Sequence, residues 1–187
     1  MKSQSLSKKL LSSHEYQELC VALQMLRNKE YGEVYKIYKK IFSNIASIES
    51  YNDLMDYIES GGKIQESIFI FGYLQYKDIC LGIGGFEEKI QKRLYPFIKN
   101  KIKDVAIIKA ISPKIDLFTD YDGDDNFFEY VFELNSKLDS INMGIVVFFD
   151  DLYYQCGYHF FILDKVIVKM ILKNWKEKDI LLVTDWV

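Results

Sequence analysis

The apolar residues of this chain change their spacing about one third of the way along the sequence. Up to residue 62 they recur every three or four positions, as they do on one face of an amphipathic helix. From residue 67 onward they occur mainly in continuous runs, which are typical of buried strands, with helical segments between them. Helices that come first and strands that come later predict an α+β fold, with N-terminal helices followed by a mixed or antiparallel sheet with packed helices.

The first part of the chain, residues 1–62, is predicted to be helical. Ser12 and Glu15 have the spacing of a capping box, in which the two side chains satisfy each other's backbone N–H groups. The apolar positions that follow predict a helix over 13–28. A second amphipathic pattern predicts a helix over 31–45, with lysines on its opposite face.

A third helix is predicted after Ser50. Ser50 and Asp53 repeat the capping-box spacing, with Asp in place of Glu, and Gly61 and Gly62 are expected to end the helix.

The second part, residues 63–187, is predicted to mix strands and helices within one globular domain that spans 1–187. In chain order the patterns predict strands at 68–71 and 79–83, a helix at 86–98 in which Pro96 marks a stop or kink, a strand at 105–111, a helix at 127–141, strands at 145–149 and 153–163, a helix at 164–177 and a strand at 180–186. For 68–71 a helix is the main alternative to the strand, because a short apolar run is compatible with either structure.

Composition restricts the class of protein. The chain has 187 residues, 49% of them hydrophobic and 27% charged, which is enough to bury one core. No apolar run approaches the roughly 20 residues that span a bilayer, and the N-terminus lacks the apolar region of a secretory signal. We therefore expect a cytoplasmic protein that does not contact a membrane. Cys20, Cys80 and Cys156 are odd in number and widely spaced, so we expect reduced thiols in the core.

Charge is distributed unevenly along the chain. The net charge is −3, yet residues 116–151 contain ten acidic residues and one lysine, a net charge of −9. Aromatic residues are interleaved with the acids. The acids are Asp116, Asp120, Asp122, Asp124, Asp125, Glu129, Glu133, Asp139, Asp150 and Asp151, and the aromatics among them include Tyr121, Phe127, Phe128, Tyr130 and Phe132.

This acidic segment, residues 116–151, predicts a binding surface for a basic protein. Negative potential attracts a basic partner and repels nucleic acid, and aromatic rings supply contact area at interfaces. The alternative is an exposed loop and a solvated helix face, with the aromatic rings turned into the core. The candidate partner-binding residues are Asp120, Tyr121, Asp122, Asp124, Asp125, Glu129, Glu133, Asp150 and Asp151.

The same carboxylates suggest a second hypothesis, a metal site. Asp120, Asp122 and Asp124 match positions 1, 3 and 5 of a calcium-binding loop. The match then fails, because Asp125 stands where the loop needs glycine and Val131 where it needs glutamate. A looser Mg²⁺ or Ca²⁺ site would make the chain a metal-dependent enzyme that acts on a phosphate-containing substrate.

Other catalytic patterns are incomplete. The glycine pattern at 82, 84 and 85 is compared with two phosphate-binding motifs. It lacks the last glycine of a dinucleotide-binding turn and the Lys-Ser/Thr of a P-loop, so a tight structural turn is expected there. Cys156 and His159 are three apart on a predicted strand and would face opposite sides. His14 and His159 are expected to be structural, and no cofactor is expected.

The leading hypothesis is therefore a small cytoplasmic binding protein, similar in action to immunity proteins, that neutralises a toxin or nuclease. Such a protein needs a scaffold that presents acids and aromatics to a cationic site, and it needs no catalytic residues. A structural or regulatory module without an acidic interface is the third possibility.

Overall fold

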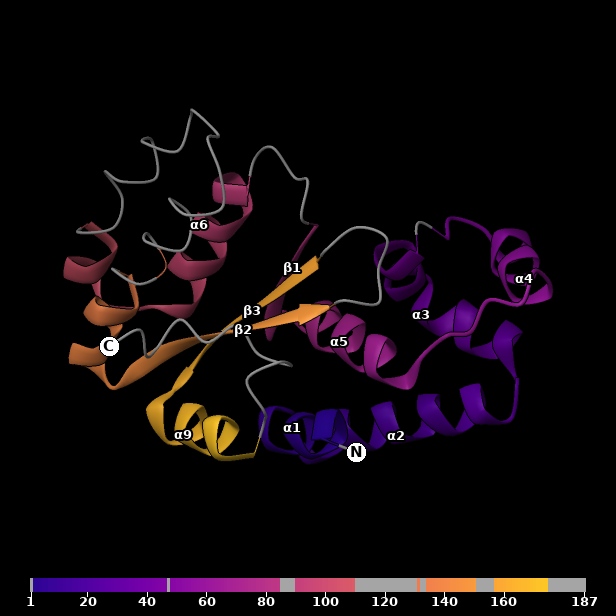
Figure 1. Cartoon of the computed structure of the whole chain (residues 1–187), viewed down its shortest axis with the longest axis horizontal. Helices are drawn as coiled ribbons and strands as arrows, with labels where there is room; N and C mark the ends of the chain where they lie inside the picture. Colours follow the sequence, from indigo (N-terminus) through magenta and orange to yellow (C-terminus); the bar gives the residue numbers. More distant parts are fainter. Residues whose placement is uncertain are drawn as a thin grey trace. The chain divides into compact units, whose positions relative to one another are not determined.

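The computed structural model describes residues 2–46, 48–84, 90–109, 131, 134–150 and 157–174 (Figure 1). The chain divides into two compact units, Met1–Ile79 and Cys80–Val187. The boundary lies beyond the change at residue 62 that the sequence suggests, because the next helix packs within the first unit. A single domain spanning 1–187 stays a prediction. The fold is α+β: the described part of the first unit is helical, and the second contains an antiparallel sheet with packed helices.

The first unit is built around its last helix. α5 contacts α1, α2 and α3, and α4 packs on α3. Figure 1 shows α5 among these helices. The helices are α1 (Lys2–Leu10), α2 (Ser13–Arg27), α3 (Tyr31–Ala46), α4 (Tyr51–Glu59) and α5 (Glu66–Tyr76).

Both predicted capping boxes are confirmed. At the start of α2, the Ser12 hydroxyl accepts a hydrogen bond from the Glu15 N–H (3.3 Å), and the Glu15 carboxylate accepts one from the Ser12 N–H (3.0 Å). Ser50 and Asp53 make the same pair of bonds before α4, at 3.1 and 2.8 Å. Because these bonds satisfy N–H groups that the helix itself leaves open, they fix where each helix begins.

The strand predicted at 68–71 is wrong, because these residues lie in α5. Phe69, Ile70, Tyr73 and Leu74 are all fully buried. A helix that neighbours enclose on several sides is apolar around its circumference, so the three-and-four spacing disappears. The resulting continuous apolar run has the pattern of a buried strand.

The second unit contains an antiparallel sheet. The described strands are β1 (Cys80–Gly84), β2 (Met143–Asp150) and β3 (Gly157–Asp164), in the order β1-β3-β2. Strands were predicted at 79–83, 145–149 and 153–163, and they are confirmed over the described residues. The pairs Ile145↔Ile162 and Val147↔Phe160 fix the register of β2 on β3.

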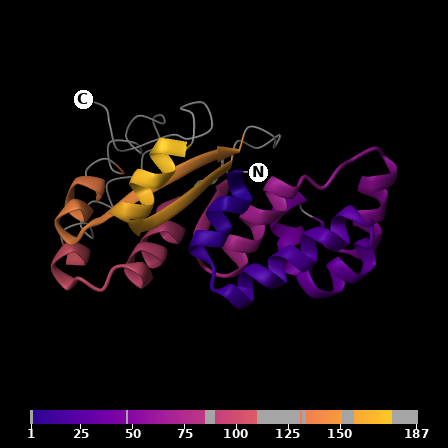
Figure 2. The ribbon, with the colours of Figure 1, turned by 90° about the horizontal axis from the view of Figure 1, so that it is seen from below.

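Helices cover both faces of this sheet within the described part of the chain, as Figure 2 shows. α9 (Lys165–Asn174) contacts β2 and β3 on one face. It packs closely there, since a Cβ on Gly144 would lie 3.3 Å from a methyl group of Val168. The opposite face joins a core with α6 (Ile90–Lys101), whose buried members are Leu94, Ile98, Ile102, Ile107, Val131, Leu134, Leu138, Ile145, Val147, Phe160 and Ile162.

Two further predictions in this unit need correction. α6 continues past Pro96 to Lys101, so the proline does not end the helix, whereas the kink proposed as the other effect of Pro96 stays a prediction. The strand predicted at 105–111 is wrong, since residues 105–109 are helical. The Asp104 carboxylate accepts hydrogen bonds from the N–H groups of Ala106 (2.8 Å) and Ile107 (3.1 Å), which caps this short helix.

The remaining predicted elements agree with the structure where it describes them. Residues 131 and 134–138 are helical and lead into a short 3₁₀ helix, η2 (Asp139–Ile141), as the helix predicted at 127–141 requires. α9 corresponds to the helix predicted at 164–177. The strand predicted at 180–186 lies outside the described residues. None of the described helices combines the length and the apolar character needed to cross a membrane.

Candidate interaction surfaces

Most of the predicted acidic surface lies outside the described residues. This holds for eight candidates: Asp120, Tyr121, Asp122, Asp124, Asp125, Glu129, Glu133 and Asp151. Asp150 is the last residue of β2, where its backbone pairs with Gly157 of β3. The three metal candidates belong to the same undescribed group. Among the described residues, no three His, Cys, Asp or Glu side chains are placed to hold a metal ion.

Residues 131 and 134–139 of the acidic segment are fixed to the sheet. Val131, Leu134 and Leu138 are buried in the core beneath the sheet. The Asn135 side-chain oxygen accepts a hydrogen bond from the Ile145 N–H (2.9 Å), which ties this helix to β2. Asp139 forms an ion pair with Lys165 at the start of α9. The described residues of the acidic segment therefore contribute to the apolar core.

A second acidic and aromatic surface, which sequence reasoning missed, lies on α4. Tyr51 and Tyr57 are 42% and 38% exposed, so each keeps more than a third of its area open to solvent. The acidic residues Glu49, Asp56 and Glu59, on or next to the same helix, are exposed too. We call Tyr51, Tyr57, Glu49, Asp56 and Glu59 the α4 face.

The sequence around the α4 face lacks basic residues between Lys40 and Lys63. Residues 41–62 contain four acidic residues and neither lysine nor arginine. The signal was present in the sequence, but it disappears when charge is summed over a longer stretch, because Lys36, Lys39 and Lys40 precede it directly.

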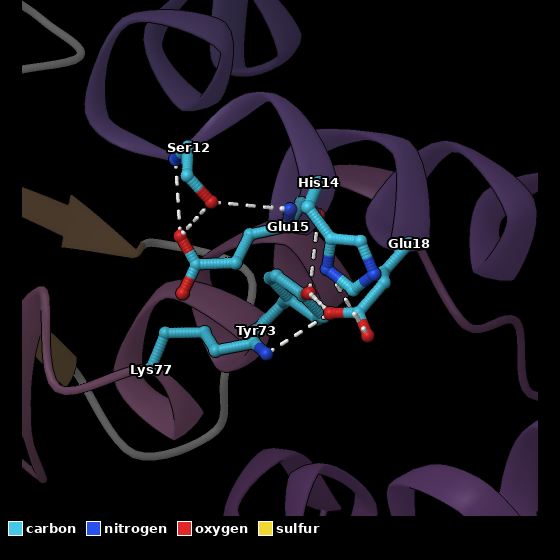
Figure 3. Close-up of polar contacts among 6 residues, drawn as sticks. All are labelled: Ser12, His14, Glu15, Glu18, Tyr73 and Lys77. Atoms are coloured by element: carbon cyan, nitrogen blue, oxygen red, sulfur yellow. Dashed lines mark hydrogen bonds and ion pairs between the residues drawn. The ribbon is translucent and has the colours of Figure 1, made fainter.

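The densest polar cluster of the first unit is centred on Glu18 (Figure 3). The Glu18 carboxylate accepts hydrogen bonds from the Tyr73 hydroxyl (2.9 Å) and from the Lys77 ammonium group (3.0 Å). His14 Nδ1 lies 3.8 Å from the other carboxylate oxygen. Tyr73 and Lys77 belong to α5 and Glu18 to α2, so the cluster joins these two helices.

The titration behaviour of this cluster follows from its contacts. Hydrogen bonds from Lys77 and then from Tyr73 hold the pKa of the Glu18 carboxyl below its ordinary value. Burial, together with the bond to Glu18, raises the pKa of the Tyr73 phenol. Tyr73 therefore remains a protonated donor, while Glu18 remains a charged acceptor. The Tyr73 ring also lies beneath the Lys77 ammonium group, 5.4 Å from it.

These contacts hold α2 and α5 together. Tyr73 is fully buried, and its hydroxyl also donates to the Glu15 backbone carbonyl (3.1 Å). Its hydrogen-bonding capacity is thus directed to α2 and away from solvent. The cluster contains acid and base groups, but the buried phenol is engaged within the protein, so we assign it to helix packing.

The two histidines lie in different environments. His14 lies in the first turn of α2, where its side chain is exposed, so its structural role stays a prediction. His159 lies in β3, as expected, opposite Gly82 of β1 and Phe148 of β2. Cys156 lies outside the described residues, so the predicted opposition of Cys156 and His159 stays a prediction.

The tight turn expected at the glycines at 82, 84 and 85 is wrong for the first two, and Gly85 lies outside the described residues. Gly82 and Gly84 are strand residues, and Gly84 pairs with Gly157. The backbone there is extended and engaged with β3, which is not the geometry of a phosphate-binding turn.

Of the cysteines expected in the core, Cys80 is buried and Cys20 is half-buried. Burial raises the pKa of the Cys80 thiol, which keeps the thiol protonated.

Comparison of the chain with protein-family models, with curated proteins and with solved structures found no match.

Proposed function

We propose that this chain is a binding protein that neutralises a basic protein partner, such as a toxin or a nuclease, through the acidic segment. The observation that carries the proposal is the charge of that segment, −9 over residues 116–151 in a chain whose net charge is −3. Like charges at this density repel one another, and a cationic partner relieves that repulsion.

The attachment of the segment supports this proposal. Its described residues are held by buried apolar side chains and by the bond from the Ile145 N–H to Asn135. One acid of the segment, Asp139, is used within the chain, in its ion pair with Lys165. A cationic partner would account for the number of the other acids.

The interleaved aromatic residues support a protein partner over a small ion. Aromatic residues are enriched at protein interfaces, and tyrosine is common among the residues that carry most of the binding energy. Carboxylates at the rim accelerate association and select the charge of the partner. Electrostatic steering of this kind weakens as salt is added, because ions screen charges beyond about 8 to 10 Å.

The test is capture of partners from the native cell extract by the full chain, at low and at high salt. The variant D122K/D124K is compared with the matched variant E30K/E33K, which changes net charge equally at exposed residues outside the segment. We expect a basic protein to be retained by wild type and by E30K/E33K, and to be lost from D122K/D124K or at high salt. Equal retention by all three proteins would contradict the proposal.

The metal-dependent alternative makes a different prediction in the same variants. If Asp120, Asp122 and Asp124 bind Mg²⁺ or Ca²⁺, calorimetric titration of the purified wild-type chain gives a saturable signal that D122K/D124K lacks and E30K/E33K keeps. The spacing of these three carboxylates is the feature that favours this alternative. A metal signal without a retained protein would replace the binding proposal with the enzymatic one.

A further inference from the structure

We draw no further inference here: the strongest candidate, the exposed side chains of Lys99, Lys103, Val105 and Lys109 at the end of α6 and just after it, carries no proposal because nothing in the described part of the structure shows what covers them.

Discussion

Replacing Tyr73 with phenylalanine tests whether the Glu18 cluster stabilises the first unit. The substitution removes one hydroxyl group and leaves the buried ring in place, so no large cavity forms. The lost bonds are the 2.9 Å contact with the Glu18 carboxylate and the 3.1 Å contact with the Glu15 carbonyl. The Lys77 ammonium group stays near Glu18 and above the ring.

The expected cost follows from the kind of bond that is lost. A buried hydrogen bond to a charged acceptor contributes about 1.5 to 3 kcal/mol. Glu18 is partly exposed and keeps its bond to Lys77, so water and Lys77 compensate for part of the loss. We therefore expect Tyr73→Phe to lower the free energy of unfolding by about 1 to 2 kcal/mol.

The assay is urea unfolding of the full chain, followed by circular dichroism at neutral pH. The dependence on urea should be unchanged, because the substitution does not alter the surface exposed on unfolding. The double variant Y73F/E18Q should lose less stability than the sum of its single variants, since each removes the same contact. A Tyr73→Phe cost within about 0.5 kcal/mol of zero, or full additivity, would refute the role given to this bond.

Three further predictions concern the first unit. Ser12→Ala removes the acceptor of the capping box and should cost about 1 kcal/mol in urea unfolding, whereas a cost near zero would contradict the cap. Gly62→Ala forces a methyl group against Tyr57 and should lower the melting temperature, while an unchanged ring environment by NMR would contradict that packing. Folding lowers the pKa of Glu18, so its contribution to stability is present above the ordinary glutamate pKa and is lost as the pH falls through the lower folded value. Glu18→Gln should therefore flatten this part of the curve of stability against pH.

Helix starts could be predicted from the sequence because capping is local. Ser12 with Glu15 and Ser50 with Asp53 place their partners three residues away, so no tertiary information is needed to locate the start of α2 or α4. The antiparallel β2–β3 pair was predictable for a related reason, since two apolar runs are separated by a short connection with turn residues.

The two wrongly predicted strands have different causes. α5 was misjudged because α1, α2 and α3 enclose it and remove its periodicity. Residues 105–109 were misjudged because Val105, Ile107 and Ile108 favour strands, whereas the two hydrogen bonds to Asp104 favour a helix start. In both segments the apolar residues were recognised from the sequence, but their secondary structure was predicted wrongly.

The candidate sites, too, could be predicted only in part from the sequence. Charge counted over the whole chain identifies the acidic segment but misses the α4 face, because the lysines of α3 cancel its charge. Exposure cannot be read from residue types either: Tyr57 and Tyr73 are the same residue on neighbouring helices of the chain, yet one is open to solvent and the other is fully buried. The packing of α5 decides which tyrosine is available to a partner.

The charge of Asp56 and Glu59 can be changed without disturbing the contacts that start and anchor α4. This helix is started by Ser50 and Asp53 and is fixed to the unit through Leu54. Asp56 and Glu59 take part in neither contact, so reversing their charge should change stability by less than about 0.5 kcal/mol. The measurement is urea unfolding of D56K/E59K, followed by circular dichroism. A larger loss of stability, or a loss of helix content, would show that these carboxylates support the fold.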